Sequence, residues 1–366
     1  MKKRLSNFEL MRIISMFFIV LWHFLLFGKM EEGTFGLTQN VIILLKAITL
    51  VHVNSFVLLT GYFNYDKKFK LSKVIKTNNS IWFYNAACIL ILLFVFGISF
   101  SKFYTFRMLL PIPRHDDYWF LVVYMLLYLL SPLLNMVING SDRTKHKMII
   151  VGLLIITIVN YLFNNELYHH ISGGYSLFSF ILLYFIGSYL HKYPIKWKKG
   201  KAITISLVGF FLLAIINTVL YKAGLILQGS SKESVRYFAD AFVNGFTAYT
   251  CPCILFGSIL YFIFFSKLEF SNKVVNFFGK YVLGTYLITQ NTLLYTRIYK
   301  PLGFALDSYN YKHILIAVGL SISFVIICSL IEALRVFIFK VIYDLKISGK
   351  LRNKITKLFK KVNINW

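Results

Sequence analysis

The stretch LMRIISMFFIVLWHFLLF, residues 10–27, is long and apolar enough to cross the hydrocarbon core of a bilayer as a helix. It nevertheless contains an arginine, Arg12, and eleven residues later a histidine, His23. At about 100° per residue the two side chains return to nearly the same helix face, roughly 16 Å apart along the axis. Glu9 begins the same stripe, three residues before Arg12. An ionisable residue inside a membrane span indicates a functional site by default.

Similar apolar runs recur along the rest of the 366-residue chain, of which 58% is hydrophobic. This pattern predicts an all-α fold, a polytopic membrane bundle of about ten transmembrane helices with no room for a separate soluble domain. The first span lacks a small-residue cleavage site, so we expect it to remain as a signal anchor. The expected spans lie at about 10–27, 37–61, 80–99, 119–138, 148–163, 175–191, 202–221, 242–265, 281–296 and 313–334.

The net charge of +26 follows the same topology. With the N-terminus inside, most of the 40 lysine and arginine residues fall in segments on that side, as the positive-inside rule requires. Both termini are therefore expected in the cytoplasm, in a protein of the cell membrane, and the charge does not call for a nucleic acid partner. We expect a membrane domain over residues 1–334 and a basic tail over 335–366, with Lys346 to Lys361 lying on anionic lipid.

The four cysteines, Cys88, Cys251, Cys253 and Cys328, lie in or at the edges of spans, so disulfides are not expected. Cys251-Pro252-Cys253 resembles half of a metal site without a second half, and no metal is expected. Three outward loops, at 100–118, 164–174 and 222–241, are candidates for an outward-facing mouth, and the last contains a mixed-charge stretch expected to form a short surface helix.

Two interpretations of the stripe in the first span remain open on spacing alone. Arg12 lies near the cytoplasmic boundary, and Glu9 stands at the spacing of a helical ion pair, so the two residues fit a boundary pair with His23 as an interfacial residue. Alternatively, one helix face presents a cation and an imidazole, which acts as a general base near neutral pH.

Polar residues also interrupt the second span, which contains Lys46, His52 and Asn54. They suggest a water-lined interior, although Lys46 has the length to snorkel outwards. Lys73 and Lys76 follow in the next cytoplasmic loop, about one turn apart at the mouth of the third span. Such a pair suits a phosphate-bearing donor such as coenzyme A, and ordinary positive-inside charge explains it equally well.

The run NFELMRIISMF at 7–17, continuing to Trp22-His23-Phe24, resembles the opening of membrane acyltransferase family 3. The first-span signature of that family is a basic residue, ten intervening residues and a histidine, and Arg12 and His23 match it. The resemblance extends over about residues 5 to 335, and three further motifs support it. They are VNSFVLLTGYF at 53–63, similar to the family's second-span ending; Lys73 and Lys76, where the family often has two arginines assigned to acyl-CoA binding; and YWFL at 118–121 with LSPLLN at 130–135, similar to members that decorate surface polysaccharides.

The resemblance implies an acyl-CoA-dependent O-acyltransferase. It would move an acyl group, acetyl being the expected one, from cytoplasmic acyl-CoA to a hydroxyl of a cell-surface polysaccharide or its lipid-linked precursor. Its partners would be acyl-CoA (acetyl-CoA as donor substrate), the glycan or lipid-linked glycan acceptor and the lipid bilayer. The alternatives are a transporter or flippase of a lipid-linked sugar, which the missing inverted repeat disfavours, and a membrane glycan polymerase.

In this interpretation His23 acts as general base or transiently accepts the acyl group. Arg12 positions the donor or stabilises oxyanion charge, and Glu9 orients Arg12. The expected donor-binding residues are Lys73 and Lys76, and the expected substrate-binding residues are His52, Asn54, Tyr118 and Trp119.

Two departures from the family pattern bear on these roles. Lysines at 73 and 76 lose the planar bidentate phosphate contacts of arginine. In GTYLITQN at 284–291, Thr289 stands where many relatives have a histidine, so the acceptor or the proton route is expected to differ.

Overall fold

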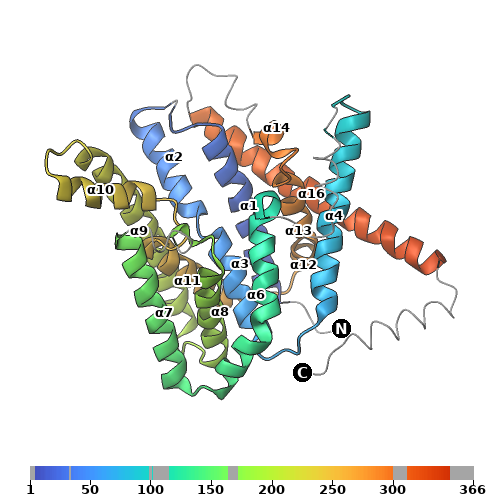
Figure 1. The fold of residues 1–366 in the computed structure, drawn as a ribbon, viewed down its shortest axis with the longest axis horizontal. Helices are drawn as coiled ribbons and strands as arrows, with labels where there is room; N and C mark the ends of the chain where they lie inside the picture. The colour runs from blue at the N-terminus through green and yellow to red at the C-terminus, as the bar shows by residue number, and fades with distance from the viewer. Residues whose placement is uncertain are drawn as a thin grey trace.

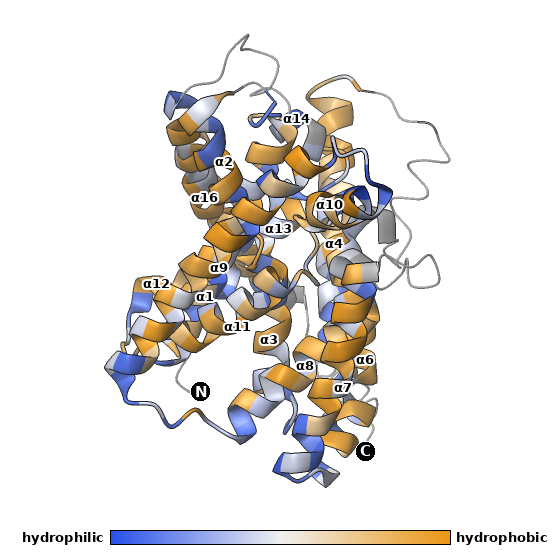
Figure 2. Cartoon of the chain, turned by 90° about the vertical axis from the view of Figure 1, so that its left-hand side faces the viewer, coloured by the Kyte–Doolittle hydropathy of each residue, from blue (hydrophilic) through white to orange (hydrophobic). Residues whose placement is uncertain are grey.

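The computed structural model describes residues 5–32, 34–98, 101, 115–163, 172–299 and 311–346. Within these ranges the regular structure is helical, without strands, which confirms the predicted all-α fold. Hydrophobic residues dominate the helices, and hydrophilic residues concentrate near the two ends of the bundle (Figure 2). Seven segments are long and apolar enough to cross a membrane: Ser6–Phe27, Gly36–Asn64, Leu71–Phe94, Tyr118–Gly140, Arg143–Leu162, Lys199–Leu227 and Tyr311–Val341.

This number is smaller than the ten spans expected, because three predicted spans are shorter or broken. The apolar helices α8 (Leu177–Lys192) and α11 (Pro252–Ser266) are too short to be counted with the seven. The predicted span 281–296 consists of α13 (Leu283–Thr289) and α14 (Tyr295–Tyr299), which are separated by an irregular segment.

Side-chain bonds to the backbone explain the breaks. The span that follows α1 (Ser6–Phe27) is divided into two helices, α2 (Gly36–Thr49) and α3 (His52–Asn64). At the junction of α2 and α3, the Nδ1 atom of His52 lies 2.6 Å from the carbonyl oxygen of Thr49. After α13, the Oδ1 atom of Asn291 accepts a hydrogen bond from the backbone N–H of Leu293 at 3.0 Å. Such local bonds offer the backbone an alternative to the helix.

Helix α1 packs against α3, α11, α12 (Lys273–Tyr281) and α16 (Tyr311–Lys346). The remaining long helices are α4 (Leu71–Phe94), α6 (His115–Gly140), α7 (Arg143–Phe163) and α9 (Lys199–Leu227), with α4 standing beside α16 (Figure 1). The short helix α10 (Glu233–Gly245) packs against α9 and confirms the surface helix expected in that loop.

Glycines allow a close helix contact between α3 and α8. A Cβ atom at Gly61 would overlap the backbone of Tyr184, and one at Gly187 would overlap the backbone of Leu58. Small residues at such positions let membrane helices approach closely. This contact fixes α3, whose first turn carries His52.

Several predictions concern residues that the structure does not describe. The middle of the loop 100–118, most of the loop 164–174 and the tail from 347 to 366 lie outside the described ranges, so the outward mouth and the lipid-bound tail stay predictions. The last helix, α16, continues without a break past residue 334, where the basic tail was expected to begin, and ends at Lys346.

Candidate functional site

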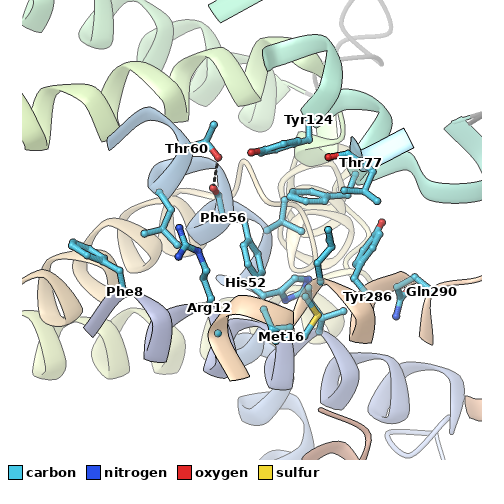
Figure 3. Close-up of a pocket in the computed structure, with 18 of the residues that line it drawn as sticks. Phe8, Arg12, Met16, His52, Phe56, Thr60, Thr77, Tyr124, Tyr286 and Gln290 are labelled. Carbon is cyan, nitrogen blue, oxygen red and sulfur yellow. Dashed lines mark hydrogen bonds between the residues drawn. The ribbon is translucent and has the colours of Figure 1, made fainter. Parts of the chain in front are cut away.

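A cavity of about 1130 Å³ follows α1 from Leu5 at one end to Phe27 at the other. Its other walls come from α3, α4, α6, α12 and α13, and Figure 3 shows part of the lining. Leu5 and Leu26, which lie at opposite ends of the cavity, are 52% and 37% exposed. At 1.5 Å per residue the lined length of α1 is about 33 Å, comparable to the thickness of a hydrocarbon core. The cavity therefore reaches both ends of the first transmembrane helix.

Glu9 and Arg12 form the predicted ion pair, with a guanidinium nitrogen of Arg12 2.8 Å from Glu9 Oε1. Both residues line the cavity. The Arg12 guanidinium lies over the ring of Phe63 at 6.0 Å, and α12 approaches so closely that a Cβ atom at Gly279 would come within 2.5 Å of Glu9 Oε2. The pair is thus held from two sides while Arg12 stays accessible from the cavity, its side chain being 29% exposed.

His23 lies in the cavity wall near the far end of α1. Its Nδ1 atom is 2.6 Å from the carbonyl oxygen of Ile19. A carbonyl oxygen only accepts hydrogen bonds, so Nδ1 carries the proton and the neutral ring leaves Nε2 as the basic nitrogen. The rings of Phe27 and Tyr299 lie nearly parallel to the imidazole, with centroids at 5.7 and 5.3 Å. His23 is therefore held in one tautomer and one orientation.

His52 and Asn54 both form hydrogen bonds with Tyr249, which lies in the segment before α11. By the same argument from Nδ1, the Nε2 atom of His52 accepts a hydrogen bond from the Tyr249 hydroxyl at 3.1 Å. The amide of Asn54 donates to the Tyr249 carbonyl oxygen at 3.0 Å. His52 and Tyr249 line the cavity, whereas Asn54 is fully buried outside its lining. Asn54 thus contributes to the cavity through Tyr249.

Three aromatic residues, Trp119, Tyr175 and Tyr249, form a group in the cavity wall that we call the aromatic cluster. The ring of Trp119 lies 4.6 Å from that of Tyr175 and stacks on that of Tyr249 at 6.0 Å. Sequence reasoning named Trp119 alone. The sequence did contain a signal that could have identified Tyr175, namely the pair Gly173-Gly174 just before it. Both glycines have positive φ, and the turn that they form packs on Tyr249.

Tyr118, the neighbour of Trp119, is buried outside the cavity lining. Its hydroxyl donates to the carbonyl oxygen of Leu287 at 2.8 Å and accepts from the amide of Asn291 at 2.8 Å. Its backbone, with φ −148° and ψ 65°, interrupts the helical geometry of α6. The position of Tyr118 therefore supports the break after α13, and its contact with a substrate stays a prediction.

Cationic side chains gather at the end of the cavity near Leu5. Lys73 lines the cavity there, and its ammonium lies 5.1 Å from the ring centroid of Tyr128. Lys67 and Lys280 line the same end, which we call the cationic mouth. Lys76, one turn beyond Lys73, is exposed and does not line the cavity. The structure thus separates the two lysines that the sequence paired.

Lys46 lies outside the cavity lining and is buried. Its ammonium forms an ion pair with Glu31 at 2.6 Å, and the hydroxyl of Tyr221 donates to the other oxygen of the same carboxylate at 2.8 Å. The residue therefore neither snorkels outwards nor lines the cavity that His52 borders.

A second buried ion pair was not foreseen. Arg335 donates to both carboxylate oxygens of Glu332 at 2.6 and 2.7 Å, and the Tyr84 hydroxyl donates to Glu332 at 2.7 Å. Bidentate geometry of this kind is specific to arginine. The pair connects α16 to α4, and Glu332 packs directly against Gly284 of α13.

Thr289, the residue in place of the family histidine, bonds within its own helix to the carbonyl oxygen of Thr285 at 2.8 Å. Its neighbour Gln290 lines the cavity and donates to the Tyr299 hydroxyl at 3.0 Å. Since the Tyr299 ring lies on His23, Gln290 connects this segment to the ring that packs on the imidazole.

Comparison with known proteins gives one positive result. The family model of the acyltransferase domain, acyltransferase family 3, matches residues 5–333, which is most of the chain. Neither the curated proteins nor the solved structures contain a match. In the described residues, no group of three or more histidine, cysteine or acidic side chains is arranged to hold a metal ion.

Proposed function

Because the chain belongs to acyltransferase family 3, it is a membrane acyltransferase, and we propose that it transfers an acyl group, acetyl in the first instance, from cytoplasmic acyl-CoA to a hydroxyl of a cell-surface polysaccharide or its lipid-linked precursor. The observation that carries this proposal is a cavity along the whole of α1 with Arg12 and His23 in its wall. The cavity offers donor and acceptor a common space from opposite ends.

The cationic mouth is the proposed donor end. The distribution of basic residues favours this side of the bundle as the cytoplasmic one. Coenzyme A carries several phosphates, and Lys67, Lys73 and Lys280 supply positive charge around the opening. Lysine acts on phosphate as a point charge, without the planar fork of arginine. Lys76 stays a predicted contact, one turn away on the exposed face.

The proposed roles of Arg12 and His23 differ because the two residues are about 16 Å apart along α1. That separation favours Arg12 as a donor-positioning residue over one that contacts the oxyanion beside His23. Glu9 orients the guanidinium through the 2.8 Å ion pair.

His23 supplies the acid–base chemistry. Its Nε2 atom takes the proton of the acceptor hydroxyl while the hydroxyl oxygen forms a new ester bond to the carbonyl carbon of the donor. The carbon–sulfur bond of the thioester breaks, and the departing thiolate takes the proton from the imidazolium. The products are the O-acylated sugar and free coenzyme A, and the neutral imidazole is restored.

The aromatic cluster is the proposed acceptor site. Tyrosine and tryptophan present an apolar ring face together with a polar group, and such rings orient ligands in otherwise apolar pockets. The cluster offers the ring faces of Trp119, Tyr175 and Tyr249. Gln290 adds an amide next to Tyr299, the ring that packs on His23. A sugar ring, with apolar C–H faces and polar edges, fits this combination.

Membranes containing the protein should transfer label from acetyl-CoA, radiolabelled in the acetyl group, to glycan, and mass spectrometry should show an acylated glycan only in cells that carry the gene. A flippase would change the sidedness of a lipid-linked sugar without labelling it. A polymerase would change glycan length without labelling it. Unlabelled glycan in membranes with correctly inserted protein would contradict the proposed reaction.

A further inference from the structure

Two helices that border the cavity, α4 and α6, are joined to each other at separated points. Lys73 and Thr77 of α4 line the cavity, as do Leu121 and Tyr124 of α6. Within the described part of the chain, α4 packs against α13 (Figure 1). Figure 3 shows Thr77 and Tyr124 on the same side of the cavity.

The first joint lies near the cationic mouth. The hydroxyl of Tyr128 on α6 accepts a hydrogen bond from the backbone N–H of Lys70 at 3.1 Å. The rings of Phe69 and Tyr128 stack with centroids 5.2 Å apart, and the ammonium of Lys73 lies over the same tyrosine. These contacts fix the start of α4 to α6.

The second joint lies deeper and runs through Asn291. Its amide donates to Asn85 Oδ1 on α4 at 2.9 Å and to the Tyr118 hydroxyl on α6 at 2.8 Å. From Lys70 to Asn85 the chain of α4 rises by about 22 Å, at 1.5 Å per residue. Between the two joints, Thr77 and Tyr124 border the cavity without an interhelical bond of their own among the described contacts.

We propose that α4 and α6 part between these two joints to form an opening, the α4–α6 portal, which lets the acyl chain of the donor extend from the cavity into the bilayer, so that the enzyme takes acyl donors much longer than acetyl. The inference rests on the proposed acyl-CoA-dependent function. It goes beyond that function by assigning the class of acyl group and the path that the group follows.

The walls next to the portal favour a hydrocarbon occupant. Phe56 and Leu59 of α3 and Phe120 and Leu121 of α6 line the cavity at this level. A hydrocarbon chain gains free energy by leaving water for such walls and for lipid beyond them, whereas sugar hydroxyls would lose hydrogen bonds there.

The cationic mouth further favours the donor over a lipid-linked acceptor as the occupant. A coenzyme A donor bound by its phosphates at Lys67, Lys73 and Lys280 has its acyl arm directed into the cavity at the depth of the portal. We assign the aromatic cluster to the sugar. Its residue on α6 is Trp119, which lies between Leu121 and the second joint at Tyr118.

The experiment uses acyl-CoAs of 4, 8, 12 and 16 carbons with a photoreactive diazirine at the end of the chain. The purified full-length protein in lipid nanodiscs is irradiated with each probe, and labelled peptides are identified by mass spectrometry with and without excess free coenzyme A. We expect coenzyme-A-competed labelling by the 12- and 16-carbon probes on α4 between Lys73 and Asn85 and on α6 between Tyr118 and Tyr128.

Two plugging variants from opposite edges, Thr77→Trp and Leu121→Trp, should lower the ratio of 16-carbon to 4-carbon labelling by about tenfold or more, because excluding even two methylenes from an apolar path costs about that factor. Leu90→Trp is the matched control on the exposed face of α4, away from the cavity, and should leave the ratio unchanged.

The outcomes separate the two proposals. Competed labelling by the 4-carbon probe alone, or long-chain labelling on other helices, would overturn the portal and leave the donor assignment standing. Labelling of the portal by a photoreactive polyprenyl phosphate that long-chain acyl-CoA does not displace would assign it to the acceptor lipid instead and overturn the inference. Absence of coenzyme-A-competed labelling at every chain length would overturn the proposed donor, and the inference with it.

Discussion

The Nδ1 atom of His23 lies 2.6 Å from the carbonyl oxygen of Ile19, one turn earlier in α1. Because the carbonyl oxygen accepts this bond, the proton of the ring is on Nδ1. The basic nitrogen, Nε2, is therefore directed away from the helix. A histidine that was merely interfacial would not need this restriction, nor the nearly parallel rings of Phe27 and Tyr299 beside it. The relationship makes His23 the first residue to test.

His23→Ala should lower acyl transfer by about 10² to 10⁴-fold, the range that a positioned general base contributes. Protein level and membrane insertion should stay normal, because the side chain lies in a cavity wall. The rate of label transfer from acetyl-CoA to glycan, normalised to inserted protein, is the measurement. Wild-type transfer by the variant would refute the general-base role.

Arg12→Lys should impair transfer severely, because an ammonium cannot reproduce the planar guanidinium that contacts Glu9 and lies over Phe63. Glu9→Gln should be milder, because it keeps the side-chain shape and loses only the charge that orients Arg12. The boundary-pair interpretation expects near-normal turnover for both variants. Initial rates normalised to inserted protein therefore decide between the two interpretations that spacing alone left open.

The first helix was predictable because its information is local. A spacing of eleven residues puts Arg12 and His23 on one face of any regular helix, and a spacing of three puts Glu9 next to Arg12. The ion pair at 2.8 Å follows from that geometry, as does the position of Arg12 and His23 on one face of the helix. The all-α membrane fold was predictable for a similar reason, since span length and hydropathy are properties of one segment at a time.

The remaining features depend on contacts between distant segments. Hydropathy treats 281–296 as one apolar run, whereas the bonds of Asn291 end the helix inside it. Periodicity pairs Lys73 with Lys76, but only neighbouring helices decide that Lys73 borders the cavity. The charge pattern of the sequence places Arg335 in the basic tail that was expected to begin after residue 334. In the structure, Arg335 instead forms an ion pair with Glu332, on the other side of that boundary.

Lys73→Ala should raise the apparent KM for acyl-CoA by about tenfold, the scale of one lost charge-assisted hydrogen bond, with a smaller effect on kcat. Binding to a remote phosphate is largely the same in the ground and transition states, which predicts this division. Lys76→Ala is the matched comparison, and because Lys76 is a predicted contact that lies one turn away and off the cavity, it should raise this KM by a smaller factor. Steady-state kinetics with varied acyl-CoA give both constants. Equal increases in KM for the two variants would contradict the larger role that the cavity lining gives to Lys73.

Gly61→Ala should destabilise the protein by about 1–3 kcal/mol, because the added methyl group overlaps the Tyr184 backbone and a close-packed contact cannot absorb it. Gly152→Ala, in α7, is the control, since a Cβ atom there meets nothing within 4 Å. It should be neutral or slightly stabilising through helix propensity. Thermal unfolding of the two variants in the same detergent provides the comparison. Equal Tm values would mean that α3 and α8 are not held as closely as described.

Trp119→Leu should raise the acceptor KM and leave the donor KM unchanged. The substitution keeps an apolar side chain but removes the ring that stacks on Tyr249, contacts Tyr175 and borders the cavity. An aromatic contact of this kind is worth about 0.5–1.5 kcal/mol beyond buried area, so the increase should be about two- to tenfold. Trp197→Leu is the matched control, since Trp197 is 43% exposed and does not line the cavity. Kinetics with the acceptor varied at saturating donor, and then the reverse, separate the two constants. A rise in the donor KM for Trp119→Leu, with the acceptor KM unaffected, would move the sugar site away from the aromatic cluster.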